Sequence, residues 1–110
     1  MQKWLLTVET NCSDPSRESE FNEWYDNIHV PDILETPGVL RATRYENNSP
    51  AEGRGKFLAL YEIETDDIGQ TMVALQENIS AKAKQGRMTE LVAIVSMGTY
   101  KQIAAPVESR

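Results

Sequence analysis

Most of the strands that this sequence predicts carry apolar side chains on both faces. In Lys3–Thr10 the alternate positions 4, 6 and 8 are apolar, and Leu5 adds an apolar group to the second face. The predicted strands Lys56–Glu64 and Leu91–Ile103 show the same double pattern. A sheet of such strands has two apolar faces, and each of them must be covered.

Two helices are predicted between the strands. The first begins at Asp14-Pro15, which supplies a cap and a first-turn proline. Its apolar stripe follows helical spacing: Phe21, Trp24, Tyr25 and Ile28. We expect this helix to end near His29, because Pro31 disfavours the helical conformation at Val30.

The second helix is predicted to start at Asp66 or Asp67 and to end near Gly86. Its buried stripe is expected to be Ile68, Met72, Leu75 and Ile79. The remaining strand is Val39–Glu46, and the loop Asn47–Gly55 follows it.

The resulting order, β-α-β-β-α-β, predicts one α+β domain over residues 1–110 with a ferredoxin-like fold. In this fold an antiparallel four-stranded sheet carries two helices on one face, so the other face needs a partner. We expect a homodimer through this open face. The alternative is a monomer whose C-terminal segment, Ala104–Arg110, folds back over the sheet.

The composition excludes several classes of function. The 110 residues carry a formal net charge of −6, and the 11 cations are scattered, which opposes binding to nucleic acid or an anionic membrane. One cysteine, Cys12, and one histidine cannot form a zinc cluster or a redox pair. With no long apolar run and no recognisable signal peptide, we expect a soluble, cytoplasmic protein.

A specific motif lies between Phe21 and Tyr45. It reads F-N-x-W-Y-D-x-x-H-x-P-D and is followed by Pro37-Gly38-Val39 and Arg41-Ala42-Thr43-Arg44-Tyr45. This segment resembles the EthD-like branch of the dimeric α/β-barrel superfamily. The resemblance implies the ferredoxin-like fold and dimerisation. Members act on small hydrophobic molecules by cofactor-free cyclisation, dehydration, decarboxylation, isomerisation or oxygenation, and the fold alone does not select among these activities.

The resemblance also implies a ligand pocket between the helices and the sheet, with a histidine near the end of the first helix. His29 matches that position, and its ordinary pKa near neutrality suits a catalytic acid or base. The candidate substrate-binding residues are Asn22, Trp24, Tyr25, Asp26, Tyr45 and Tyr61. Asp26 could orient the imidazole or face water, and Asn22 could make a local hydrogen bond instead.

Several of these candidate residues also have a purely structural interpretation. His29 could cap or pack against the helix end, and Trp24 and Tyr25 could anchor the helix in the core. Tyr45 and Tyr61 face either the helices or the partner subunit, and the sequence leaves this open.

The sequence therefore favours a cofactor-free enzyme that uses acid/base catalysis on a hydrophobic carbonyl or a polyketide-like or aromatic substrate. The reaction would be a cyclisation, dehydration, decarboxylation or isomerisation. One alternative is a non-catalytic dimeric module that binds a hydrophobic metabolite. Another is an accessory protein of an oxidative degradation system.

Overall fold

The computed structural model describes all 110 residues, Met1–Arg110. The elements are β1 (Gln2–Cys12), η1 (Pro15–Arg17), α1 (Glu18–Trp24), η2 (Tyr25–His29), α2 (Val30–Ile33), β2 (Val39–Glu46), β3 (Phe57–Thr65), α3 (Ile68–Lys84) and β4 (Val92–Lys101). From η1 to α2 the helical segments follow one another without a break and form a first helical arm, residues 15–33. The predicted β-α-β-β-α-β order is confirmed.

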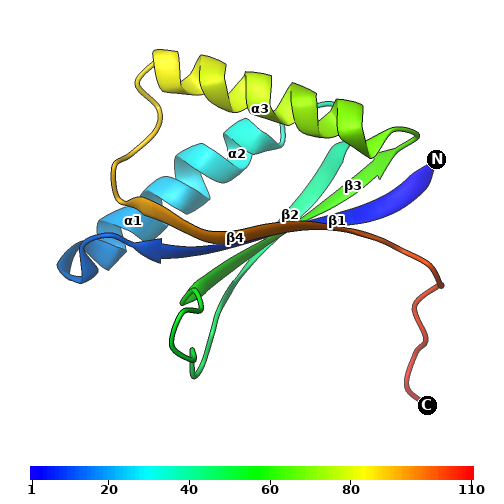
Figure 1. Ribbon diagram of the computed structural model, residues 1–110, viewed down its shortest axis with the longest axis horizontal. Helices are drawn as coiled ribbons and strands as arrows, with labels where there is room; N and C mark the ends of the chain where they lie inside the picture. The colour runs from blue at the N-terminus through cyan, green and yellow to red at the C-terminus, as the bar shows by residue number, and fades with distance from the viewer.

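The four strands form one antiparallel sheet in the order β2-β3-β1-β4. The first helical arm and α3 lie on the same face of this sheet (Figure 1). This arrangement is the predicted ferredoxin-like α+β fold, with β3 and β1 as its central strands.

The core lies between this face and the helices. Strands β1 and β3 turn alternate side chains toward the helices, as their period of two requires. The buried strand residues include Leu6, Val8, Phe57, Ala59, Tyr61 and Ile63, and the helices contribute Phe21, Tyr25, Ile33 and Leu75. The predicted apolar stripes therefore face the sheet except at Ile28, which is half-buried and does not join the core; Trp24, Ile68, Met72 and Ile79 are partly buried against it.

The prediction that the first helix ends near His29 is wrong. Val30 has helical dihedral angles, with φ −59° and ψ −49°, and the helix continues to Ile33. The turn in between is π-helical, because the N–H of Val30 donates to the carbonyl of Tyr25, five residues earlier. Pro31 then occupies the first turn of α2, where its missing N–H is tolerated.

The predicted helix ends are confirmed elsewhere. The Asp14 carboxylate accepts the N–H of Ser16 at the start of η1, and the Asp67 carboxylate accepts the N–H of Gln70 at the start of α3. Gly86 follows α3 with φ of +75°, the left-handed conformation that glycine adopts without strain. None of the helices has the length and apolarity needed to cross a membrane.

The opposite face of the sheet is open and rich in apolar side chains. Leu5, Tyr45 and Tyr100 are 37%, 51% and 60% exposed. Residues 102–110 follow β4 and are exposed throughout. Three residues of this tail, Gln102, Ala104 and Pro106, reach the edge of a concavity on the open face, but Leu5, Tyr45 and Tyr100 stay exposed. The alternative in which the tail folds back to cover the sheet is therefore wrong.

Candidate active site

His29 is the last residue of the π turn, and its imidazole packs among aromatic side chains. The ring lies 4.7 Å from the ring of Trp24 and nearly parallel to it, and 5.0 Å from the ring of Tyr25, edge-on. In a regular α-helix, residues five apart point in different directions, whereas the wider π turn brings Trp24 and His29 together. The unpredicted turn thus gives the candidate histidine its stacking partner.

The surroundings of His29 keep the imidazole uncharged at neutral pH. Burial is the largest cause and lowers the pKa of His29 from 6.5 to about 4; the Asp32 carboxylate opposes this effect and the Arg44 guanidinium adds to it. A neutral imidazole has a free nitrogen lone pair, so it can accept a proton. His29 is therefore suited to act as a general base.

This lowered pKa predicts a specific pH dependence of stability. Between pH 6.5 and about 4 the unfolded chain holds a proton on His29 that the folded chain does not, so stability falls as pH falls through this window. Above pH 6.5 the contribution is constant. From pH 7.5 to 5.0 we expect wild type to lose about 1–2 kcal/mol more than His29→Gln. Urea unfolding of both proteins at the two pH values measures this difference, and equal losses would contradict it.

A polar network lies beside the aromatic rings. Arg44 of β2 donates to Asp26 Oδ1 at 2.8 Å and to Asn22 Oδ1 at 2.9 Å, so it ties two candidate residues of the helical arm to the sheet. Its guanidinium carbon also lies 4.1 Å from the centre of the Tyr25 ring, in cation–π geometry. Sequence analysis missed Arg44 as a site residue. Its position two residues after Ala42, on the helix-facing side of β2, was the available signal.

Tyr61 points toward the helices from central strand β3 and is 2% exposed. Its hydroxyl makes no hydrogen bond of good geometry, although the Tyr25 hydroxyl is close enough to affect its pKa. Burial, together with the neighbouring phenol of Tyr25, raises the pKa of Tyr61, so its hydroxyl stays protonated. A buried hydroxyl without a partner costs about 1–3 kcal/mol. Tyr61 therefore offers a free O–H donor on the same side of the sheet as His29.

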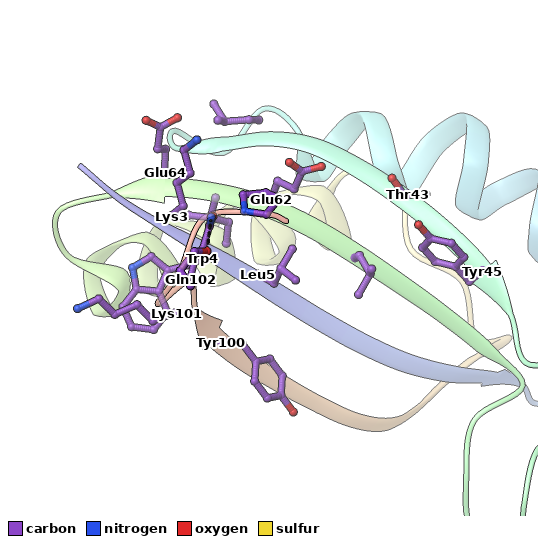
Figure 2. Close-up of a pocket in the computed structure, with 15 residues that line it drawn as sticks. Lys3, Trp4, Leu5, Thr43, Tyr45, Glu62, Glu64, Tyr100, Lys101 and Gln102 are labelled. Atoms are coloured by element: carbon purple, nitrogen blue, oxygen red, sulfur yellow. Dashed lines mark hydrogen bonds between the residues drawn. The ribbon is translucent and has the colours of Figure 1, made fainter. Parts of the chain in front are cut away.

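Tyr45 is the one candidate that lies apart from the others. It is on the open face, where it lines a concavity of about 480 Å³ with side chains from all four strands, including Leu5, Leu60 and Tyr100 (Figure 2). Two further concavities of about 440 and 490 Å³ lie near the start of α3 and near Arg54. None of these three is lined by His29. Between the helical arm and the sheet, where the resemblance implied a ligand pocket, the rings of Phe21, Tyr25 and Phe57 pack together instead.

Asp32, three residues after His29, is also buried. Its carboxylate accepts two hydrogen bonds from the guanidinium of Arg87, at 2.7 and 3.0 Å. These hydrogen bonds are the main reason that the pKa of Asp32 is lowered. The indole N–H of Trp24 donates to the backbone carbonyl of Arg87 at 2.8 Å. The loop between α3 and β4, residues 85–91, thus contacts residues on both sides of His29 in the sequence.

No protein-family model matches this chain. A curated relative, core atranone cluster (CAC) protein 1 from Stachybotrys chlorohalonatus, is 34% identical over 61 residues. The matched region is 54% of this chain but only 26% of that protein, so the chain spans about a quarter of the relative's length.

Solved structures match over almost the whole chain. A dimeric ferredoxin-like protein from an uncultured marine organism has a TM-score of 0.67 at 8% identity, covering 96% of this chain and 100% of that one. SnoaB, a cofactor-independent oxygenase from Streptomyces nogalater, has a TM-score of 0.62 at 10% identity, covering 98% and 100%. An EthD family protein from Bacillus halodurans has a TM-score of 0.53 at 19% identity, covering 89% and 97%.

The chain therefore shares the ferredoxin-like fold of these solved structures. Because an EthD family protein is among these structures, the fold that the EthD-like resemblance implied is confirmed.

Proposed function

We propose that this chain is a cofactor-free enzyme of small-molecule metabolism that removes a proton next to a carbonyl group of a hydrophobic, aromatic or polyketide-like substrate. The observation that carries the proposal is the neutral imidazole of His29, held in a stack with Trp24. The similarity in fold to a cofactor-independent oxygenase supports this class of function. Cyclisation, dehydration, decarboxylation and isomerisation all fit a single base of this kind.

In the proposed step, a ring nitrogen of His29 takes the proton from the carbon next to the carbonyl. The electron pair left behind moves onto the carbonyl oxygen and forms an enolate. The unpartnered hydroxyl of Tyr61 is the donor that would stabilise this oxygen, and the imidazolium then returns its proton to the product. Tyr25, Asn22 and Asp26 would shape the site. The packed rings must part to admit a substrate.

We also propose that the protein works as a cytoplasmic homodimer, joined through the open face of the sheet. The apolar residues on that face support this arrangement, because an exposed apolar patch of this kind marks an association surface. The fold is shared with proteins described as dimeric ferredoxin-like. Tyr45 would then contact the partner subunit or a ligand held between the subunits.

Deuterium exchange tests the proposed chemistry without the natural substrate. In D₂O, wild type should catalyse exchange of the acidic C–H of 2-tetralone and related aryl ketones, followed by proton NMR. His29→Ala should be at least about tenfold slower, because a positioned base contributes this much or more. Asn27→Ala is the matched control, since Asn27 is an exposed residue of the same π turn, and its rate should equal wild type.

The outcomes separate the candidate functions. Equal rates for wild type and a folded His29→Ala would remove His29 from the mechanism. Tight ketone binding by wild type with no exchange would favour the non-catalytic binding module instead.

A further inference from the structure

Arg87, in the loop between α3 and β4, forms hydrogen bonds with two residues close to His29, namely Trp24 and Asp32. Arg87 accepts the indole N–H of Trp24 through its backbone carbonyl at 2.8 Å. It donates to both oxygens of Asp32 through its guanidinium, at 2.7 and 3.0 Å. Trp24 precedes His29 by five residues and stacks on its ring, while Asp32 follows by three. A single residue from outside the helical arm thus holds the segments on either side of His29.

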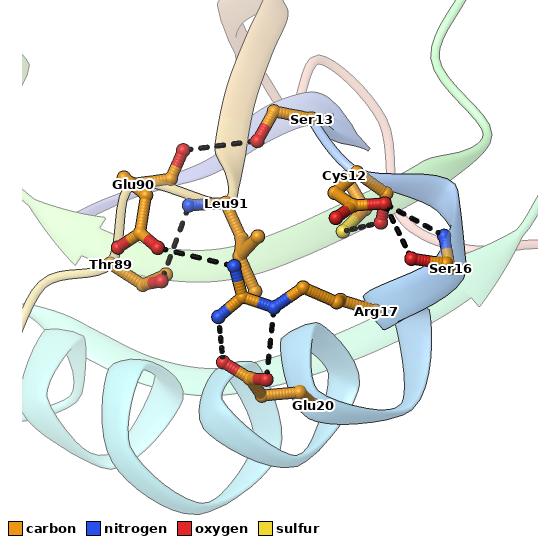
Figure 3. A network of polar contacts seen from close by, with 9 residues as sticks. Cys12, Ser13, Ser16, Arg17, Glu20, Thr89, Glu90 and Leu91 are labelled. Carbon is orange, nitrogen blue, oxygen red and sulfur yellow. Dashed lines mark hydrogen bonds and ion pairs between the residues drawn. The ribbon is translucent and has the colours of Figure 1, made fainter.

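The rest of this loop is fixed independently of Arg87. At its far end, Arg17 forms ion pairs with Glu20 and with Glu90 of the loop (Figure 3). The Ser13 hydroxyl donates to the carbonyl of Glu90 at 3.1 Å. Arg87 and Arg17 therefore make two separate attachments of one loop, and only the attachment through Arg87 reaches the surroundings of His29.

The charges around His29 explain why the attachment matters. Asp32 on α2 is negative and favours a protonated imidazole, whereas Arg44 on β2 opposes protonation. The phenols of Tyr25 and Tyr61 are neutral, since burial raises the pKa of each. Arg87 is the main counter-charge of Asp32, with Lys82 of α3 contributing less. Without Arg87, the Asp32 carboxylate would act on the imidazole with less compensation.

We propose that Arg87 is a positioning residue for His29: its carbonyl fixes the Trp24 ring against the imidazole, and its guanidinium compensates Asp32, whose charge favours the protonated imidazole. This inference rests on the proposed role of His29 as a base. Arg87 itself does not touch the reacting atoms. Its effect reaches His29 through Trp24 and Asp32.

The single histidine of the chain gives a direct test, because its imidazole proton signal in NMR has no competitor. In wild type we expect His29 to remain neutral from pH 7.5 to 5. In Arg87→Gln, which keeps the backbone carbonyl that Trp24 contacts, we expect the ring-current shift from Trp24 to remain and the titration midpoint to rise by about one pH unit or more. In the deuterium-exchange assay, the rate of Arg87→Gln should then decrease more steeply as pH falls from 7 to 5.

Two further variants separate positioning from simple support of the loop. Arg87→Lys keeps the positive charge and should restore most of the wild-type titration, even where stability is reduced. Arg17→Gln removes the other arginine attachment of the same loop, with a side chain of nearly equal exposure, 40% against 41%. It should leave the His29 signal unchanged.

A folded Arg87→Gln with the wild-type titration midpoint would overturn the proposal. If Arg87→Gln does not fold, Arg87→Lys is the test. This variant keeps the positive charge, so a His29 titration that differs from wild type would also overturn the proposal. The NMR measurements need no substrate. A shifted titration together with full exchange activity in His29→Ala would therefore leave the role of Arg87 in place and refute only the proposed function.

Discussion

Leu60→Glu is expected to leave the protein monomeric at concentrations where the wild-type chain forms the proposed dimer. Leu60 lies on central strand β3, where it pairs with Thr7 and Thr43. A carboxylate in the middle of the open face would lose its hydration on association without gaining a partner. We expect the dissociation constant to rise at least about a hundredfold, equivalent to about 3 kcal/mol. Sedimentation velocity over a dilution series measures this change.

Val73→Glu is the matched control for this experiment. Val73 is an apolar residue of α3 that is 58% exposed, so the substitution adds the same charge on the helical side of the molecule. Its dissociation constant should equal that of wild type. An unchanged dimer in Leu60→Glu would place the interface elsewhere, and a monomeric wild type at micromolar concentration would refute the homodimer altogether.

Phe21→Ala is expected to cost about 3–5 kcal/mol of the free energy of unfolding. Phe21 is fully buried, and its ring lies 5.6 Å from Tyr25 and 5.5 Å from Phe57, so it joins the helical arm to β3. Removing the ring leaves a cavity that the surrounding rings fill only in part. Urea unfolding monitored by circular dichroism at pH 7.5 measures the loss.

Val73→Ala provides the reference for this measurement, since it removes apolar atoms from an exposed site and should change stability by less than about 0.5 kcal/mol. A loss below about 1 kcal/mol for Phe21→Ala would mean that the helical arm is held to the sheet by other contacts. The arrangement of rings around His29 would then not depend on Phe21.

The alternation of apolar residues was sufficient to predict the four strands, but not the face of every side chain, because register shifts at Val39/Arg41 and Glu9/Thr10 interrupt the alternation. Val39–Glu46 was predicted with the bounds that the structure has, and the other strands differ by one or two residues at their ends. The caps at Asp14 and Asp67 were equally predictable, because an oxygen acceptor before a helix satisfies N–H groups within a few residues. These features depend on local chemistry.

The π turn could not be predicted in the same way. The rule that proline disfavours a helical residue before it is local, and it favoured an end near His29. Tyr25, which precedes Val30, and Ile33, which follows it, are both buried, and their burial keeps the whole arm on the sheet. Packing across the sheet therefore outweighs the local preference at Val30 by an amount that no pattern in the sequence shows.

The candidate site was predictable only where the helix determined it. Asn22, Trp24, Tyr25, Asp26 and His29 lie within about two turns of one helical arm, so the motif brings them together. Whether Tyr45 and Tyr61 join them depends on which face of a strand each occupies, and the pairing with neighbouring strands decides this. Tyr61 faces the helices and Tyr45 does not.

The sheet is a single layer, so consecutive residues of one strand serve opposite sides of the molecule. On β3, Leu60 belongs to the surface proposed for association, and the next residue, Tyr61, to the side proposed for chemistry. A slip of one residue in the pairing of β3 would exchange the two, turning the phenol outward and the leucine inward. Misfolded copies of this kind would lose the ability to assemble and the ability to react in the same event.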